Sequence, residues 1–136
     1  MTTVEQFLAA LAEVESSNNP LAWGDFVDKA GTPSGHPDPA AAVQAGFNPQ
    51  AMGRWQVHPD RLVFEAKRLN IWPTLGETLD LWVERILRAI WLEESANWAP
   101  DVIAMYWHKQ VWCYRGTPAW DTTYGARFNA ALAKVS

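Results

Sequence analysis

Hydrophobic positions recur at helical spacing in the first part of the chain. One stripe at i, i+3 and i+4 positions is apolar: Val4, Phe7, Leu8 and Leu11. Thr3 precedes the stripe and Gln6 follows three residues later, which is a capping-box pattern. The pattern therefore predicts an amphipathic helix that begins at Thr3 and ends within the Ser, Asn and Pro residues of 16–20.

Helical spacing returns after Pro59. The predicted helices are Asp60–Leu69, a segment opened by a Thr74/Glu77 capping box and running to about Glu94, Pro100 to about Tyr114, and Asp121–Lys134. The helix ending near Glu94 carries apolar residues over the widest arc. We therefore expect it to be the buried central helix.

Residues 21–53 are rich in glycine and proline and favour no long regular element. A short helix is predicted from Asp38 and Pro39 to Gly46, and a small strand or hairpin near Leu21–Lys29. The chain thus reads as one mainly α domain, residues 1–136, with a Gly/Pro-rich lobe inserted after the first helix.

Composition narrows the function classes. The chain has 136 residues, 49% of them hydrophobic and 19% charged, which suits one folded domain. A net charge of −4 argues against nucleic acid as the main partner. The longest apolar runs, Phe7–Ala12 and Val102–Trp107, are too short to span a membrane, and no secretory signal peptide is visible. One cysteine and three histidines predict no internal disulfide, no metal site and no cofactor. We expect a monomer.

Nine tryptophans are unusual in so short a chain. A tryptophan offers a flat apolar face and one N–H donor, which suits a core or a groove for ring-shaped ligands. We expect most of them in the core and some along a groove.

Glu15 is the main catalytic candidate. It lies four residues after Leu11, so its side chain follows the apolar stripe, whereas Glu13 lies on the solvated side. Apolar surroundings favour the neutral form of a carboxyl, as a general acid requires. The alternative is a helix-end glutamate without a chemical role.

Three segments carry a family resemblance. Glu-Ser-Ser-Asn-Asn-Pro at 15–20 resembles the Glu-Ser-x-x-Asn-Pro signature of lytic transglycosylases of the soluble-lytic-transglycosylase group. Gly-Arg-Trp-Gln-Val-His-Pro at 53–59 is similar to the Gly-Leu-Met-Gln-Ile/Val-x-Pro motif of that family, and Ala-Met-Tyr-Trp at 104–107 to its Ala-x-Tyr-Asn motif. Arg54 and Trp55 replace the Leu-Met pair, and Trp107 replaces the asparagine. The resemblance implies a lysozyme-like fold.

The resemblance also implies cleavage of the β-1,4 bond between N-acetylmuramic acid and N-acetylglucosamine in peptidoglycan strands. Glu15 would act first as general acid and then as base, giving a 1,6-anhydro sugar. A lysozyme-type hydrolase is an alternative and would need a second carboxylate, Asp25 or Asp28. A non-catalytic glycan-binding module of a phage or secretion assembly is another. The substrate places the protein in the periplasm or on the cell wall, delivered by a phage or a virion, or processed from a longer product.

Supporting roles follow from the same motifs. The resemblance implies that Ser16 hydrogen-bonds near the reacting sugar, that Gln56 orients the acid or the acetamido group, and that Tyr106 hydrogen-bonds the glutamate. The alternatives are that Ser16 only ends the helix, Gln56 ties down the lobe and Tyr106 belongs to the core. Trp55 and Trp107 would either stack on sugar faces or pack inside the domain.

Overall fold

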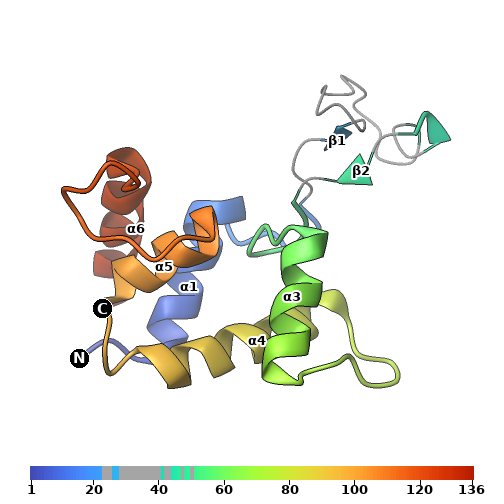
Figure 1. Cartoon of the computed structure of the whole chain (residues 1–136), viewed down its shortest axis with the longest axis horizontal. Coiled ribbons are helices and arrows are strands. Elements are labelled where there is room, and N and C mark those ends of the chain that lie inside the picture. Colours follow the sequence, from blue (N-terminus) through green and yellow to red (C-terminus); the bar gives the residue numbers. More distant parts are fainter. Residues whose placement is uncertain (23–25, 28–40, 42–43, 47, 50) are drawn as a thin grey trace.

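The computed structural model describes residues 1–22, 26–27, 41, 44–46, 48–49 and 51–136. Five helices of ten or more residues dominate this part of the chain, so the predicted mainly α class is confirmed (Figure 1). They are α1 (Val4–Ser16), α3 (Pro59–Leu69), α4 (Leu79–Glu94), α5 (Pro100–Lys109) and α6 (Thr122–Val135). None of the described helices combines the length and the apolar character needed to cross a membrane.

Local capping residues set most helix starts. The hydroxyl of Thr3 accepts the backbone N–H of Gln6, and the Gln6 side chain accepts the backbone N–H of Thr3, which confirms the predicted capping box. Asp121 caps α6 by accepting the N–H of Tyr124. Proline stands in the first turn of α3 and α5, where a missing N–H costs nothing.

The predicted start of α4 at the Thr74/Glu77 box is wrong. The carboxylate of Glu77 accepts the N–H of Thr74, but these residues form a turn rather than the first turn of a helix. The same carboxylate pairs with Arg85 at 2.7 Å. The helix begins at Leu79, where the side chain of Thr78 accepts the N–H of Leu81. Two capping signals thus lie close together, and the second one starts the helix.

Two further predictions about α4 and α5 are also wrong. α5 ends at Lys109 rather than near Tyr114, because Gln110 adopts a left-handed conformation with φ 62°. α5 is also the most buried helix, with every residue from Asp101 to Trp107 buried, whereas α4 buries only Val83, Ile86, Leu87 and Ile90. A wide apolar arc on α4 therefore leaves Leu81 and Leu92 exposed.

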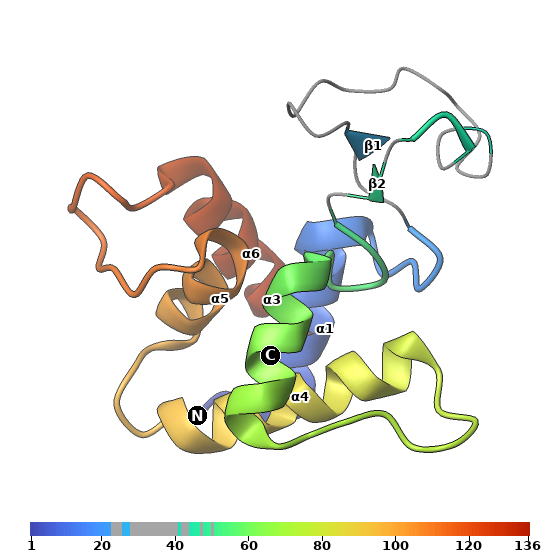
Figure 2. The same cartoon turned by 45° about the vertical axis from the view of Figure 1, so that its right-hand side comes forward.

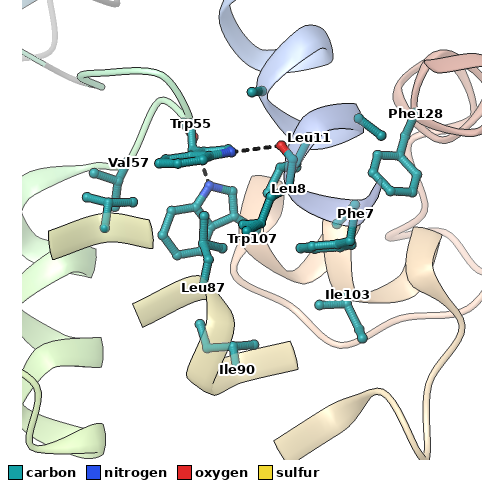
Figure 3. Close-up of a cluster of buried hydrophobic side chains, with 14 of the residues drawn as sticks. Phe7, Leu8, Leu11, Trp55, Val57, Leu87, Ile90, Ile103, Trp107 and Phe128 are labelled. Carbon is teal, nitrogen blue, oxygen red and sulfur yellow. Dashed lines mark hydrogen bonds between the residues drawn. The ribbon is translucent and has the colours of Figure 1, made fainter. Parts of the chain in front are cut away.

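The hydrophobic core lies where α1, α4, α5 and α6 meet (Figure 3). Phe7 and Phe128 are fully buried and their ring centroids lie 5.9 Å apart. The ring of Phe7 also lies 4.7 Å from that of Trp91. Cys113 is buried as a free thiol, as a small hydrophobic residue would be. This core holds the C-terminal end of α1 in place.

Two short strands lie beyond the N-terminal end of α3 (Figures 1 and 2). They are β1 (Phe26–Val27) and β2 (Asn48–Pro49), which pair antiparallel, so a strand near Leu21–Lys29 is confirmed. Nearer the helices, Gly53 N–H donates to the carbonyl of Ala22 at 2.8 Å. The predicted helix start at Asp38 and Pro39 lies outside the described residues, whereas Gly46, its predicted end, has φ 92°.

Candidate functional site

Glu15 lies one residue before the end of α1, and its carboxyl group is mostly buried. Its side chain keeps 10% of its surface exposed. The hydroxyl of Tyr124, in the first turn of α6, donates a hydrogen bond of 2.7 Å to Oε2 of Glu15. The predicted burial of Glu15 along the apolar side of its helix is therefore what the structure shows. The packing of α1 against α6 supplies the partner.

His108 and Asp121 complete this cluster, which we call the Glu15 cluster (Glu15, His108, Asp121 and Tyr124). Nδ1 of His108 lies 3.7 Å from Oε2 of Glu15, and Nε2 lies 3.8 Å from Oδ2 of Asp121. The imidazole stacks on the Tyr124 ring with centroids 3.8 Å apart. An imidazole therefore stands between two carboxylates at the end of α5.

Two pKa shifts describe the electrostatics of this cluster. Burial raises the pKa of Tyr124 well above its ordinary value, and the neighbouring Glu15 adds to the shift by its charge and its hydrogen bond. The backbone N–H of Tyr124 lowers the pKa of Asp121. Tyr124 thus remains a protonated donor toward Glu15, and Asp121 remains an acceptor.

The structure does not join Tyr106 to Glu15. The Tyr106 hydroxyl donates instead to Oε1 of Glu65 at 2.7 Å. Helix geometry explains the difference, because Tyr106 and His108 are two residues apart on α5 and project about 200° apart around the axis. The side that faces Glu15 carries His108, and the predicted hydrogen bond of Tyr106 to the catalytic candidate is wrong.

Tyr106 belongs to a second buried group, the Glu65 cluster (Arg61, Glu65, Arg68 and Tyr106). Glu65 is fully buried, and its Oε2 accepts Nη2 and Nε of Arg68 at 2.7 and 3.0 Å. The guanidinium carbon of Arg61 lies 4.3 Å from the Tyr106 ring centroid. Burial and the hydrogen bond to Glu65 raise the pKa of Tyr106 to about 12. This cluster ties α3 to α5.

Ser16 links two of the motif segments. Its Oγ donates to the carbonyl of Arg54 at 2.6 Å and accepts the backbone N–H of Asn19 at 3.0 Å. These contacts end α1 and fix it against the segment beginning at Gly53. The described contacts of Ser16 are thus structural, which favours the simpler of the two predicted roles.

Gln56 stands in a tight turn. Met52 and Val57 form an antiparallel bridge with reciprocal hydrogen bonds of 3.0 Å, so residues 53–56 turn between them. Gln56 has φ 49°, and its side-chain amide donates to the carbonyls of Gly53 at 2.9 Å and Ala22 at 3.4 Å. Within the described chain it makes no hydrogen bond to Glu15. Its contacts match the alternative in which it ties down the base of the lobe.

The two tryptophans of the motifs are core residues. Trp55 is 4% exposed and its indole N–H donates to the carbonyl of Leu8, while the indole N–H of Trp107 donates to the carbonyl of Trp55 (Figure 3). Both rings are buried and both donors are used, so the alternative of stacking on sugar faces does not hold in this conformation. Their role is to hold the turn against α1 and α5.

Arg54 has a structural role that the sequence did not indicate. Its guanidinium pairs with Asp80 in the first turn of α4, with Nε 3.0 Å from Oδ1, and also donates to the backbone carbonyl and side chain of Asn18. The residue that departs from the family motif therefore joins the end of α1, the turn and α4. Asp25 and Asp28, proposed for a hydrolase, lie outside the described residues.

Among the residues that the structure describes, no group of three or more His, Cys, Asp or Glu side chains is placed to hold a metal ion. No family model, curated protein or solved structure matches the chain.

Proposed function

We propose that this protein is a peptidoglycan lytic transglycosylase with a lysozyme-like fold, in which Glu15 is the general acid and then the base. The observation that carries the proposal is the position of Glu15: a nearly buried carboxyl at the end of α1, held by Tyr124 and joined through Ser16 to the turn at 53–56. Two segments that resemble family motifs are thereby adjacent in space.

The contacts of Glu15 support different roles for its two carboxyl oxygens. The Tyr124 hydroxyl and the His108 imidazole both lie at Oε2, at 2.7 and 3.7 Å. Among the described residues no hydrogen bond reaches Oε1. Tyr124 would fix the orientation of the carboxyl through Oε2, and Oε1 would carry the proton that is transferred to substrate.

The proposed reaction needs one carboxyl group. Glu15 gives its proton to the glycosidic oxygen as the bond between that oxygen and C1 of N-acetylmuramic acid breaks, and positive charge develops at C1. The acetamido group of the substrate stabilises this charge. The 6-hydroxyl of the same sugar then bonds to C1 and returns a proton to Glu15, so that no water is consumed. Asp25 and Asp28 have no part in this scheme.

Mass spectrometry of muropeptides released from purified peptidoglycan tests the proposal. We expect 1,6-anhydro ends from the wild type and no release by Glu15→Gln, which has nearly the same shape but lacks a titratable proton. Glu13→Gln is the matched control, because Glu13 lies two residues away on the exposed side of α1. Thermal unfolding of all three proteins verifies that they are folded.

Each other outcome points to a defined alternative. Reducing ends in place of anhydro ends would identify a lysozyme-type hydrolase. Binding of glycan strands without release by the wild type would identify a binding module. Undiminished release by Glu15→Gln would remove Glu15 from the chemistry.

A further inference from the structure

A tryptophan just before α6 packs onto the helix that it introduces. Trp120 precedes the N-cap residue Asp121, and its ring lies on Gly125, the fourth residue of α6. A hydrophobic contact between these two positions is a hydrophobic staple, which fixes the angle at which a chain enters a helix. Asp121 and Tyr124 lie between the two residues in sequence, so the staple spans the α6 part of the Glu15 cluster.

The staple depends on the absence of a side chain at Gly125. A Cβ atom at this position would lie 2.8 Å from Cζ2, 3.0 Å from Nε1 and 3.1 Å from Cε2 of Trp120. Carbon atoms in favourable contact are about 3.5–4.0 Å apart. Gly125 is buried, and Trp120 is packed against the hydrophobic core. A methyl group added here would therefore displace either the indole ring or the first turn of α6.

The backbone around Trp120 is held from two sides. The N–H of Trp120 donates to the carbonyl of Thr117 at 3.1 Å. The ammonium group of Lys109, which follows His108 at the end of α5, donates to the carbonyl of Ala119 at 2.9 Å. These contacts connect the residue that carries the indole ring to the helix that carries His108.

The first turn of α6 carries the hydroxyl group that binds Glu15. Asp121 accepts the N–H of Tyr124 on its side chain at 3.0 Å and the N–H of Gly125 on its carbonyl at 2.9 Å. A glycine allows more backbone freedom than other residues, so this turn gains from the contact with Trp120. Tyr124 reaches Oε2 of Glu15 at 2.7 Å with the far end of its side chain. A small rotation of the turn would therefore move the hydroxyl out of hydrogen-bond range.

We infer that Trp120 is a positioning residue for Glu15. Its indole ring, seated on Gly125, fixes the first turn of α6 and thereby places the Tyr124 hydroxyl on Oε2, which leaves Oε1 for the substrate. The inference rests on the proposed function where it concerns cleavage. The placement of the Tyr124 hydroxyl is independent of that function and is measured separately.

Two variants disturb the staple from opposite sides. Gly125→Ala adds a methyl group beneath the ring, and Trp120→Leu removes the ring without adding an atom to α6. We expect each to lower kcat for muropeptide release about tenfold with KM unchanged, because the staple acts on the acid and not on glycan binding. In a Tyr124→Phe background neither should lower cleavage further. Ala126→Gly is the matched control, because it weakens the same helix at an exposed position and should retain the wild-type kcat.

Fluorine NMR measures the placement of Tyr124 without an activity assay. The chain has three tyrosines, so protein labelled with 3-fluorotyrosine gives three signals that the single Tyr→Phe variants assign. We expect Gly125→Ala and Trp120→Leu to shift the signal of Tyr124 and to leave those of Tyr106 and Tyr114 in place.

The results separate this inference from the proposed function. An unmoved Tyr124 signal, a wild-type kcat, or losses that add to that of Tyr124→Phe would each overturn the role of Trp120. An equal loss in Ala126→Gly, or unfolding of both staple variants, would make the contact purely structural and overturn it as well. If the Tyr124 signal moves but Glu15→Gln still cleaves, the placement of Tyr124 stands and the proposed function falls.

Discussion

Among the described residues, two carboxyl groups each accept a tyrosine hydroxyl at 2.7 Å, yet their surroundings differ. Glu65 is fully buried between Arg61 and Arg68, and Tyr106 is its phenol partner. Glu15 is paired with Tyr124 and approached by His108, and a tenth of its side chain reaches solvent. Within the described chain no arginine or lysine forms an ion pair with Glu15.

This difference separates a structural carboxylate from a candidate catalytic one. Glu65 is paired with two arginines and accepts the Tyr106 hydroxyl, so its contacts join α3 to α5. Glu15 has only a phenol and an imidazole near it and retains access to solvent, as proton transfer to a substrate requires. A tyrosine hydrogen bond alone therefore does not distinguish the two glutamates, whereas the charged neighbours do.

Exchange of each glutamate for glutamine should give opposite results, and this is the largest expected effect. Glu15→Gln should reduce peptidoglycan cleavage by about 10²–10⁴-fold with little change in stability. Glu65→Gln should lower the free energy of unfolding by about 3–5 kcal/mol, because it leaves two arginines without their buried partner. Muropeptide release and urea unfolding measure the two effects. A stable Glu65→Gln protein would contradict the structural role of Glu65.

Removal of each tyrosine hydroxyl should also affect cleavage and stability differently in the two clusters. Tyr124→Phe deletes the hydrogen bond that orients Glu15, so we expect cleavage to fall about tenfold. Tyr106→Phe should leave cleavage near the wild-type rate at a temperature where the protein is folded, while its stability falls by about 1.5–3 kcal/mol, as for a hydrogen bond to a charged group. Cleavage rates and thermal unfolding measure both variants. If Tyr106→Phe and Tyr124→Phe lost the same cleavage activity, Tyr106 would have to act together with Glu15.

His108→Phe tests how much the imidazole contributes. A phenyl ring can keep the stacking on Tyr124 but removes both nitrogens that lie near Glu15 and Asp121. Because these contacts are longer than hydrogen bonds and the imidazole is partly exposed, we expect a loss of at most about fivefold in cleavage, equivalent to about 1 kcal/mol. A loss above a hundredfold, measured by muropeptide release, would make His108 part of the catalytic machinery.

Alkaline unfolding tests the raised pKa values of the two buried tyrosines. The pKa of Tyr106 is about 12 in the folded protein, against 10.0 for an unperturbed tyrosine, and the pKa of Tyr124 is also raised. The unfolded chain therefore loses these protons first, so that stability is fully present below about pH 10 and falls as the pH rises toward 12. Urea unfolding at several pH values measures the slope. Tyr106→Phe should show a shallower decline, and an identical slope would contradict the assigned shift.

The sequence predicted helices well where a single local signal acts. The capping box at Thr3 and the proline that opens α5 each act within one helical turn, and the structure confirms both. The wrong boundaries arise where local signals compete or are weak. Thr74 and Thr78 both carry capping signals, and the left-handed Gln110 ends α5 without a glycine or proline to announce it.

The sequence predicts the burial of Glu15 but not the residues that contact it. The burial of Glu15 follows from its position four residues after Leu11, and this is visible in the chain itself. Its hydrogen-bond partner Tyr124 is 109 residues away and depends on how α1 packs against α6. No residue next to His108 in the sequence indicates a partner for its imidazole. The sequence also does not indicate the Glu65 cluster, because charged residues along a helix usually lie on a solvated face.

The hydrogen bond between Gly53 and Ala22 has a consequence for protein engineering. It joins the residue at which the chain leaves the helices, Ala22, to the residue at which it returns, Gly53. The side-chain amide of Gln56 donates a second hydrogen bond to the same Ala22 carbonyl. Because the entropy of closing a loop rises only slowly with its length, the segment between these two residues should accept exchange for shorter or longer sequences. Such an exchange should leave the position of Glu15 at the end of α1 unchanged, because its contact with Tyr124 lies outside that segment.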